Sequence, residues 1–337
     1  MPNLPGLGSQ TLPAQLHRAG LALRAEVQRH GLELSTGRAA DPSRRLGGDL
    51  GAWSAIESRL ARISAADQAL NAQMLRAGAV QAGLAQISTQ ADRLRGATLA
   101  AGAGEATAAA LARLGAQGRQ TLEDIGSTLA RGVAGQAPFA GNLPDRAPLA
   151  PSATILAAAA AAVAGATTAD EVIQRVQDLF EAPGGVFETA LYLGGAPVSA
   201  GGPPGEGDLA PLPTAADPAL RATLQDAVLA ALAGDEAALP DPALRRGLVP
   251  LVIARQAQTA GQLAALQGAV GATEAALADR RERLSVERDG LDLARAGRIG
   301  VDPYEAATRL EEARLRLESL YVVTARTARL TLTEYLR

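Results

Sequence analysis

Few residues in this chain could carry chemistry. The 337 residues include two histidines, His17 and His30, and no cysteine, so thiolate nucleophiles, disulfides and cysteine metal sites are excluded. The histidines lie on different faces of any helix that holds both, which rules out a simple two-histidine ligand pair. All 32 cationic side chains are arginines, whereas Walker A phosphate loops and Schiff-base catalysis need lysine. We therefore expect no cofactor and no metal.

The charged and glycine-rich positions also favour a protein that is not an enzyme. Glu305 with Arg309 and Glu312 with Arg316 sit four residues apart, the spacing of ion pairs on a solvated helix face. No glycine pair fits a phosphate-binding fingerprint. The net charge is −3 and only 2% of residues are aromatic, so we expect no nucleic-acid groove. The longest apolar run, Ile155 to Ala164, is too short for membrane insertion, and the start lacks the pattern of a secretory signal.

Proline placement indicates where long helices can form. Fourteen of the nineteen prolines lie between Pro138 and Pro250, and none lies between Pro42 and Pro138 or between Pro250 and Pro303. Because proline is nearly excluded from helix interiors, the proline-free stretches can hold long helices. Asp41-Pro42 and Asp302-Pro303 both resemble an N-cap followed by proline at the first helical position, so we expect helices to start there.

Both long stretches show apolar residues at heptad spacing, which predicts an antiparallel coiled coil between them. The intramolecular seam comprises Trp53, Ile56, Leu60, Ile63, Leu70 and Leu84 in the first stretch, and Leu263, Val270, Leu277, Leu284 and Leu291 in the second. Between them, helical patterns and one strand candidate, Val186 to Leu193, predict a small α+β domain.

The two ends of the chain carry apolar residues that this seam does not use. The last helix, from Pro303, is apolar nearly all round, so we expect it to be buried on more than one side, by other subunits. The predicted assembly interface consists of Leu16, Leu23, Val27, Leu34, Leu310, Leu317, Leu320, Tyr321, Leu330, Leu332, Tyr335 and Leu336.

The predicted fold class is mainly α, with long antiparallel coiled-coil arms and the inserted α+β domain. The expected divisions are an N-terminal assembly segment (1–42, disordered in the monomer), a coiled-coil arm (43–137), an outward-facing domain (138–250), a second arm (251–300) and a C-terminal assembly helix (301–337).

Both ends resemble one protein family. Leu34-Ser35-Thr36-Gly37-Arg38, then Asp41-Pro42 and a heptad helix, resembles the start of bacterial flagellins and flagellar hook-associated protein 3. The segment from Asp302-Pro303-Tyr304-Glu305 to Tyr335-Leu336 is similar to the C-terminal helix of the same superfamily. The turn Pro138-Phe139-Ala140-Gly141-Asn142 resembles the hook-filament junction proteins. Pro2, Pro5 and Pro13, and Gln136-Ala137, depart from the family pattern.

The resemblance implies a structural subunit that is exported unfolded by the flagellar type III apparatus, without a cleaved signal. Its terminal segments would order only on assembly, where neighbours supply buried surface. The implied location is secreted, at the hook-filament junction. The implied partners are other copies in a ring, a hook-associated protein on the hook side, flagellin on the filament side and an export chaperone. The alternatives are a flagellin-like filament subunit and, from another class, a cytoplasmic coiled-coil adaptor.

Overall fold

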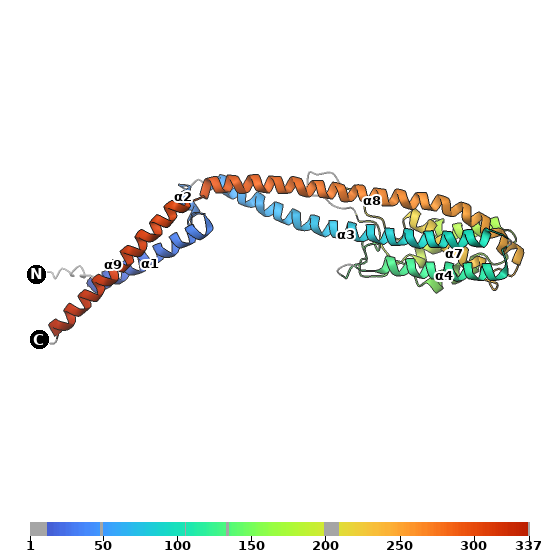
Figure 1. Ribbon diagram of the computed structural model, residues 1–337, viewed down its shortest axis with the longest axis horizontal. Coiled ribbons are helices and arrows are strands. Elements are labelled where there is room, and N and C mark those ends of the chain that lie inside the picture. The colour runs from blue at the N-terminus through green and yellow to red at the C-terminus, as the bar shows by residue number, and fades with distance from the viewer. Residues whose placement is uncertain (1–11, 48–49, 105, 133–134, 199–208, 336–337) are drawn as a thin grey trace, which may run out of the picture. The chain divides into compact units, whose positions relative to one another are not determined.

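The computed structural model describes residues 12–47, 50–104, 106–132, 135–198 and 209–335, with the backbone alone at 12–13 and 327–335. The elements in Figure 1 are α1 (Leu12–Thr36), α2 (Pro42–Arg45), α3 (Gly51–Gly102), α4 (Ala108–Ala130), α5 (Ser152–Ala162), α6 (Ala169–Glu181), the π-helix η1 (Phe187–Leu191), α7 (Pro218–Ala233), α8 (Pro242–Ile299) and α9 (Pro303–Tyr335). Extended pairing among these residues is limited to isolated bridges such as Leu149 with Tyr192. The prediction of a mainly α fold is confirmed.

The chain divides into two compact units. Met1–Ala65 and Leu284–Arg337 form one, which we call the terminal unit, and Ala66–Arg283 forms the other, the central unit. Both divisions fall inside helices, so α3 and α8 each contribute to both units. The central unit therefore includes parts of the two predicted arms as well as the predicted inserted domain.

The connection between α1 and α3 differs from the prediction of a long helix starting at Asp41-Pro42. Asp41 caps a helix as expected, because its Oδ1 accepts the backbone N–H of Arg44 at 3.1 Å. That helix, α2, ends at Arg45, and Gly47 follows with a φ of 59°. A left-handed residue cannot continue a right-handed helix. The long helix starts instead at Gly51.

The predicted strand at Val186 to Leu193 is wrong. Residues Phe187–Leu191 form η1 instead. Phe187 and Leu191 are buried, while the three residues between them are exposed, which is a helical rather than a strand period. The ring of Phe187 packs 5.3 Å from that of Phe180 on α6, so burial of this aromatic pair favours the turn of helix.

In the central unit α4 and α7 lie side by side (Figure 1) and approach closely through glycines. A Cβ added to Gly115 would lie 2.7 Å from the Cα of Gly234, and one added to Gly118 would lie 2.7 Å from the carbonyl oxygen of Ala227. Neither distance leaves room for a side chain, so the two backbones touch. Helix α7 is buried on nearly every face, which makes it the centre of this unit.

Helices α3 and α8 contact each other in antiparallel order within the central unit. Asp67 pairs with Arg281 at 3.5 Å, and Gln256 donates to Thr98 at 3.1 Å. A Cβ on Gly102 would touch Ile253 at 3.0 Å. Helix α8 begins at Pro242 and runs through Pro250, so it starts before the predicted second arm at 251.

Candidate functional site

Among the residues that the structure describes, no group of three or more histidine, aspartate or glutamate side chains is placed to hold a metal ion. No helix in the described part of the chain is both long and apolar enough to cross a membrane. Most of the predicted assembly residues lie on the paired helices of the terminal unit, which makes this pair the candidate functional surface.

Helices α1 and α9 pair in antiparallel fashion, side by side in Figure 1. At one end of the pair, the N–H of Ala39 donates to the carbonyl of Ile299 at 2.8 Å, and the N–H of Val301 donates to that of Gly37 at 3.1 Å. Further along, a Cβ on Gly20 would lie 3.5 Å from Cδ2 of Leu320. The two ends of the chain thus bury part of their apolar surface against each other.

The inner faces of this pair hold many of the predicted assembly residues. Leu310 is 6% exposed, and Ala306 and Ala313, on the same face, are buried more fully. Those that are partly buried are Leu16, Leu23, Val27, Leu317 and Leu320. Helix α1 of the same chain therefore covers one face of α9, and burial of its other faces by other subunits stays a prediction.

The remaining predicted assembly residues lie elsewhere. Leu34 is 38% exposed and Tyr321 is 45% exposed. The backbone of Leu330, Leu332 and Tyr335 belongs to α9, but their side chains are outside the described part, and Leu336 lies outside the described residues altogether.

The predicted intramolecular seam is placed on α3 and α8. Its fully buried members are Ile63, Leu70, Leu84, Leu263, Val270, Leu277 and Leu284. Its partly buried members are Trp53, Ile56, Leu60 and Leu291. In the terminal unit, ion pairs between Glu57 and Arg295, at 2.6 Å, and between Arg59 and Glu287 join the two helices.

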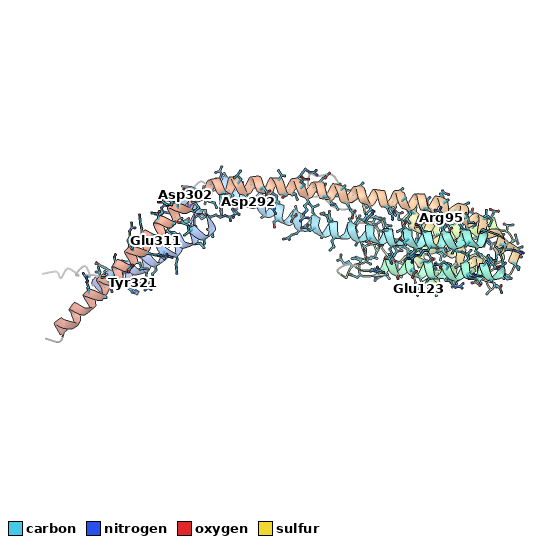
Figure 2. All side chains as sticks on the ribbon, in the orientation of Figure 1. Arg95, Glu123, Asp292, Asp302, Glu311 and Tyr321 are labelled. Carbon is cyan, nitrogen blue, oxygen red and sulfur yellow. The ribbon has the colours of Figure 1, made fainter. Side chains whose placement is uncertain are left out.

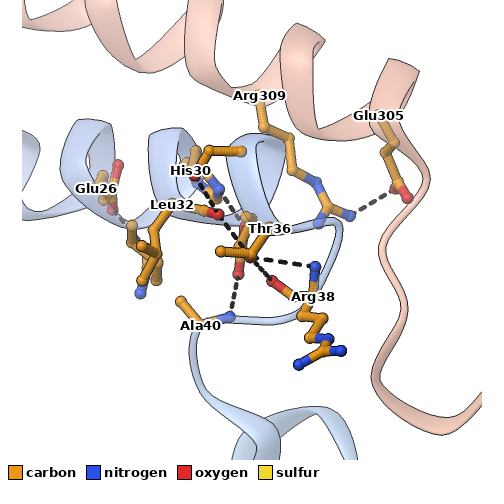
Figure 3. A network of polar contacts seen from close by, with 11 residues as sticks. Glu26, His30, Leu32, Thr36, Arg38, Ala40, Glu305 and Arg309 are labelled. Carbon is orange, nitrogen blue, oxygen red and sulfur yellow. Dashed lines mark hydrogen bonds and ion pairs between the residues drawn. The ribbon is translucent and has the colours of Figure 1, made fainter. Parts of the chain in front are cut away.

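A polar network fixes the turn at the end of α1 (Figure 3). Glu33, which is 8% exposed, contacts Nδ1 of His30 through Oε2 at 2.8 Å and accepts the N–H of Ala40 through Oε1 at 3.2 Å. Burial alone would raise the pKa of Glu33, but these hydrogen bonds and the charges of His30 and Arg29 outweigh it and hold the pKa below its usual value. The ionised carboxylate therefore anchors the chain as it leaves α1.

A mixed-charge cavity of about 400 Å³ adjoins this turn. Arg44 and Arg45 line it together with Arg29, but so do Glu26 and Asp41. Because both signs of charge are present, the lining gives no selectivity for an anion. The cavity lies where α1, α2 and α9 meet.

The outward faces of α1 and α9 carry a second set of apolar side chains. On α1 the exposed fraction is 52% for Leu21 and 53% for Leu32. On α9 it is 83% for Tyr304, 61% for Leu315 and 49% for Val322. We call these five residues the outer stripe. The spacings of eleven within α1, and of eleven and seven within α9, each keep the residues on one side of a helix. Both sides lie opposite the inner faces.

The sequence-based list of assembly residues omits all five members of the outer stripe. The spacing of Leu315 and Val322 was a signal for it, since they form a row separate from Leu310 and Leu317. What the sequence alone did not reveal is which row α1 covers and which row stays exposed.

Comparison with known proteins does not add a family to these observations. A scan against protein-family models gives no match, and a search of curated proteins gives none either.

Proposed function

We propose that this chain is a structural, non-enzymatic subunit that assembles with other protein subunits through the outer stripe of its terminal helix pair. The observation that carries this proposal is the exposure of Tyr304, Leu315 and Val322 on the face of α9 away from α1. Large exposed apolar side chains that share one face of a helix are candidates for contact with another subunit. A neighbouring helix would cover them.

The energetic argument is the burial of large side chains. Full burial of one leucine, valine or aromatic side chain contributes about 1.5–3 kcal/mol. Because the two residues on α1 and the three on α9 face away from each other, each neighbour would bury one of these two groups, and in a repeating array every subunit would make both contacts. Ordering of the terminal segment only on assembly stays a prediction of this proposal.

The flagellar assignment within this class rests on the resemblance of both chain ends to the flagellin and hook-associated protein superfamily. Its support here is that α1 and α9 pair in antiparallel order and that α3 and α8 bury a heptad seam. We propose that α3 and α8 form the antiparallel coiled coil of a hook-filament junction subunit. It would be secreted unfolded with an export chaperone and would form a ring between a hook-associated protein and flagellin.

Two alternative functions can be distinguished from this proposal by simple observations. A flagellin-like filament subunit would polymerise into long filaments after purification. A cytoplasmic coiled-coil adaptor would be missing from both the culture medium and purified hooks.

The proposal is tested by electron microscopy of cells that lack the chain, with a blot for flagellin in the medium. Bare hooks with flagellin lost to the medium are the expected result. Bare hooks with no filament protein in the medium would make the chain the filament subunit, and normal filaments would contradict any flagellar assembly role.

A further inference from the structure

A buried polar network in the central unit joins α6, α7 and α8 and plays no part in the proposed assembly. On α8, Arg255 donates from Nη2 to Oε1 of Gln225 at 2.6 Å and from Nε to Oδ1 of Asp226 at 3.3 Å. Gln225, on α7, donates in turn to Oε1 of Glu181, the last residue of α6, at 3.0 Å. One arginine therefore contacts one carboxylate directly and is linked to a second through an amide.

The positive charge of this arginine has to be balanced in nearly dry surroundings. An arginine side chain keeps its charge in proteins, and that of Arg255 is only 18% exposed. A cation with so little water around it is stable only beside a negative charge. Asp226 supplies that charge when it is ionised, so protonation of Asp226 would leave Arg255 in need of another carboxylate.

The two carboxylates of the network differ in burial, which decides which of them takes up a proton first as pH falls. Asp226 is 3% exposed, whereas Glu181 is exposed at the end of its helix. Removal from water disfavours the charged form of a carboxyl. Burial raises the pKa of Asp226 to about 6, although hydrogen bonds from Thr259 and Arg255 and the charge of Arg255 oppose the shift. Asp226 therefore becomes neutral under mildly acidic conditions.

The placement of the other charged groups leaves Glu181 as the second partner for Arg255. Asp92 and Arg95, on α3, line a small cavity beside Asp226. Arg255 lines a different cavity, between α6, α7 and α8, together with Glu181. Rotation of its side chain in that cavity brings Arg255 towards Glu181 and away from α3.

Arg221, on α7, is another cation that lines the cavity with Glu181. Its Nη1 donates to the carbonyl of Phe180 at 3.0 Å, and its charge acts on Asp217, four residues earlier. Because Arg221 is engaged by these groups, Glu181 is available to Arg255.

We propose that this network is a proton-operated switch. With Asp226 ionised, Arg255 pairs with it and ties α8 to α7. When Asp226 takes up a proton, Arg255 turns to Glu181 and ties α8 to α6. Gln225 already contacts both Arg255 and Glu181, so the exchange takes place by rotation of side chains.

A double-mutant cycle between Arg255 and Glu181 tests the switch at two pH values, near pH 5 and near pH 7.5. Urea unfolding of the full-length protein would be followed by circular dichroism for wild type, Arg255→Gln, Glu181→Gln and the double variant. The coupling should be about fivefold larger, in the folding equilibrium constant, at the lower pH, because the pair forms only when Asp226 is protonated. In an Asp226→Asn background, which mimics the protonated carboxyl, the coupling should have the larger value at both pH values.

A matched variant and a second measurement complete the test. Asp178→Asn changes an exposed carboxylate three residues before Glu181 on α6, and it should show no coupling to Arg255 at either pH. NMR of the Arg255 Nε–H signal keeps the arginine in place: the signals of wild type and Glu181→Gln should differ more near pH 5 than near pH 7.5. Equal coupling between Arg255 and Glu181 at the two pH values, or signals that differ equally at both, would overturn the proposal.

Discussion

Arg24 and Tyr321 lie 297 positions apart in the sequence and meet where α1 pairs with α9. Nε of Arg24 donates to the phenol oxygen of Tyr321 at 2.8 Å, and its guanidinium carbon lies 5.7 Å from the ring centroid. Figure 2 shows Tyr321 on α9 beside α1. The contact combines a hydrogen bond with a cation–π interaction, so it helps to set the register of the two helices near the middle of α1, away from the Gly37 turn.

A double-mutant cycle should measure that contact. Arg24→Gln and Tyr321→Leu are each expected to lower the free energy of unfolding, with a coupling energy of about 0.5–1 kcal/mol for an exposed contact. Trp53 is the sole tryptophan and lies in the terminal unit, so its fluorescence during urea unfolding reports this part of the molecule. Additive effects of the two changes would show that the contact does not couple the helices.

Removing the charge of Glu33 should loosen the turn after α1. Because the folded-state pKa of Glu33 is lowered below its usual value of 4.5, its stabilisation is present above that value and is lost as pH falls through the folded-state pKa. Glu33→Gln is expected to cost about 1–2 kcal/mol at pH 7, by loss of charged hydrogen bonds.

The measurement is the difference between wild-type and Glu33→Gln unfolding midpoints, by Trp53 fluorescence, as a function of pH. The difference should be constant near neutral pH and shrink below pH 4.5. Glu26→Gln, on the same helix with a 3.9 Å ion pair to Arg29, should change stability by less than about 0.5 kcal/mol. If Glu33→Gln lowers the free energy of unfolding by no more than Glu26→Gln does, the anchoring role of Glu33 is contradicted.

Asp226 should make the central unit less stable as pH rises. Burial raises the pKa of this carboxyl from 3.8 to about 6, although hydrogen bonds from Thr259 and Arg255 oppose the shift. The folded state therefore keeps a proton that the unfolded chain loses above pH 3.8, and the free energy of unfolding falls through this window until about pH 6. The total effect of such a shift is about 3 kcal/mol.

Asp226→Asn should remove that pH dependence. The variant is expected to become more stable relative to wild type as pH rises from 4 to 6, and the difference should then level off. Circular dichroism during chemical unfolding, recorded across this pH range, checks the prediction. If the free energy of unfolding depends on pH in the same way for wild type and Asp226→Asn, Asp226 does not keep its proton in the folded state.

Two glycines of α4 offer a matched test of the close helix packing. Gly118 faces the backbone of α7, whereas a Cβ on Gly126 would meet nothing within 4 Å. Gly118→Ala should destabilise by about 2 kcal/mol or more, because the backbones must move apart. Gly126→Ala should stabilise by about 0.5–1 kcal/mol through helix propensity. Thermal unfolding measures both, and a neutral Gly118→Ala would contradict the observed approach.

The sequence predicts helices well where periodicity and caps agree. Asp302-Pro303 starts α9 as expected, and Asp302 Oδ1 accepts the N–H of Tyr304 at 2.8 Å. The expectation fails at Asp41-Pro42, because a cap starts a helix but does not set its length, which Gly47 limits here. The strand predicted at Val186 to Leu193 also fails, because packing of Phe187 against Phe180 favours a turn of helix there.

The candidate surfaces were harder to predict than the helices. The buried row of α9 and its exposed row, with Leu310 and Leu315 as examples, have similar apolar residues. Which row is covered depends on α1, nearly 300 positions away in the sequence.

The outer stripe is tested by comparing two leucines that are about equally exposed. Leu315 on α9 is 61% exposed and Leu75 on α3 is 58% exposed. Cells lacking the chain would be supplied with wild type, Leu315→Glu or Leu75→Glu, and hooks would be purified and blotted for the chain. We predict that wild type and Leu75→Glu remain on the hooks, while Leu315→Glu is folded and exported but absent from them. Hooks that carry Leu315→Glu as fully as wild type, or that lack wild type altogether, would contradict assembly through this stripe.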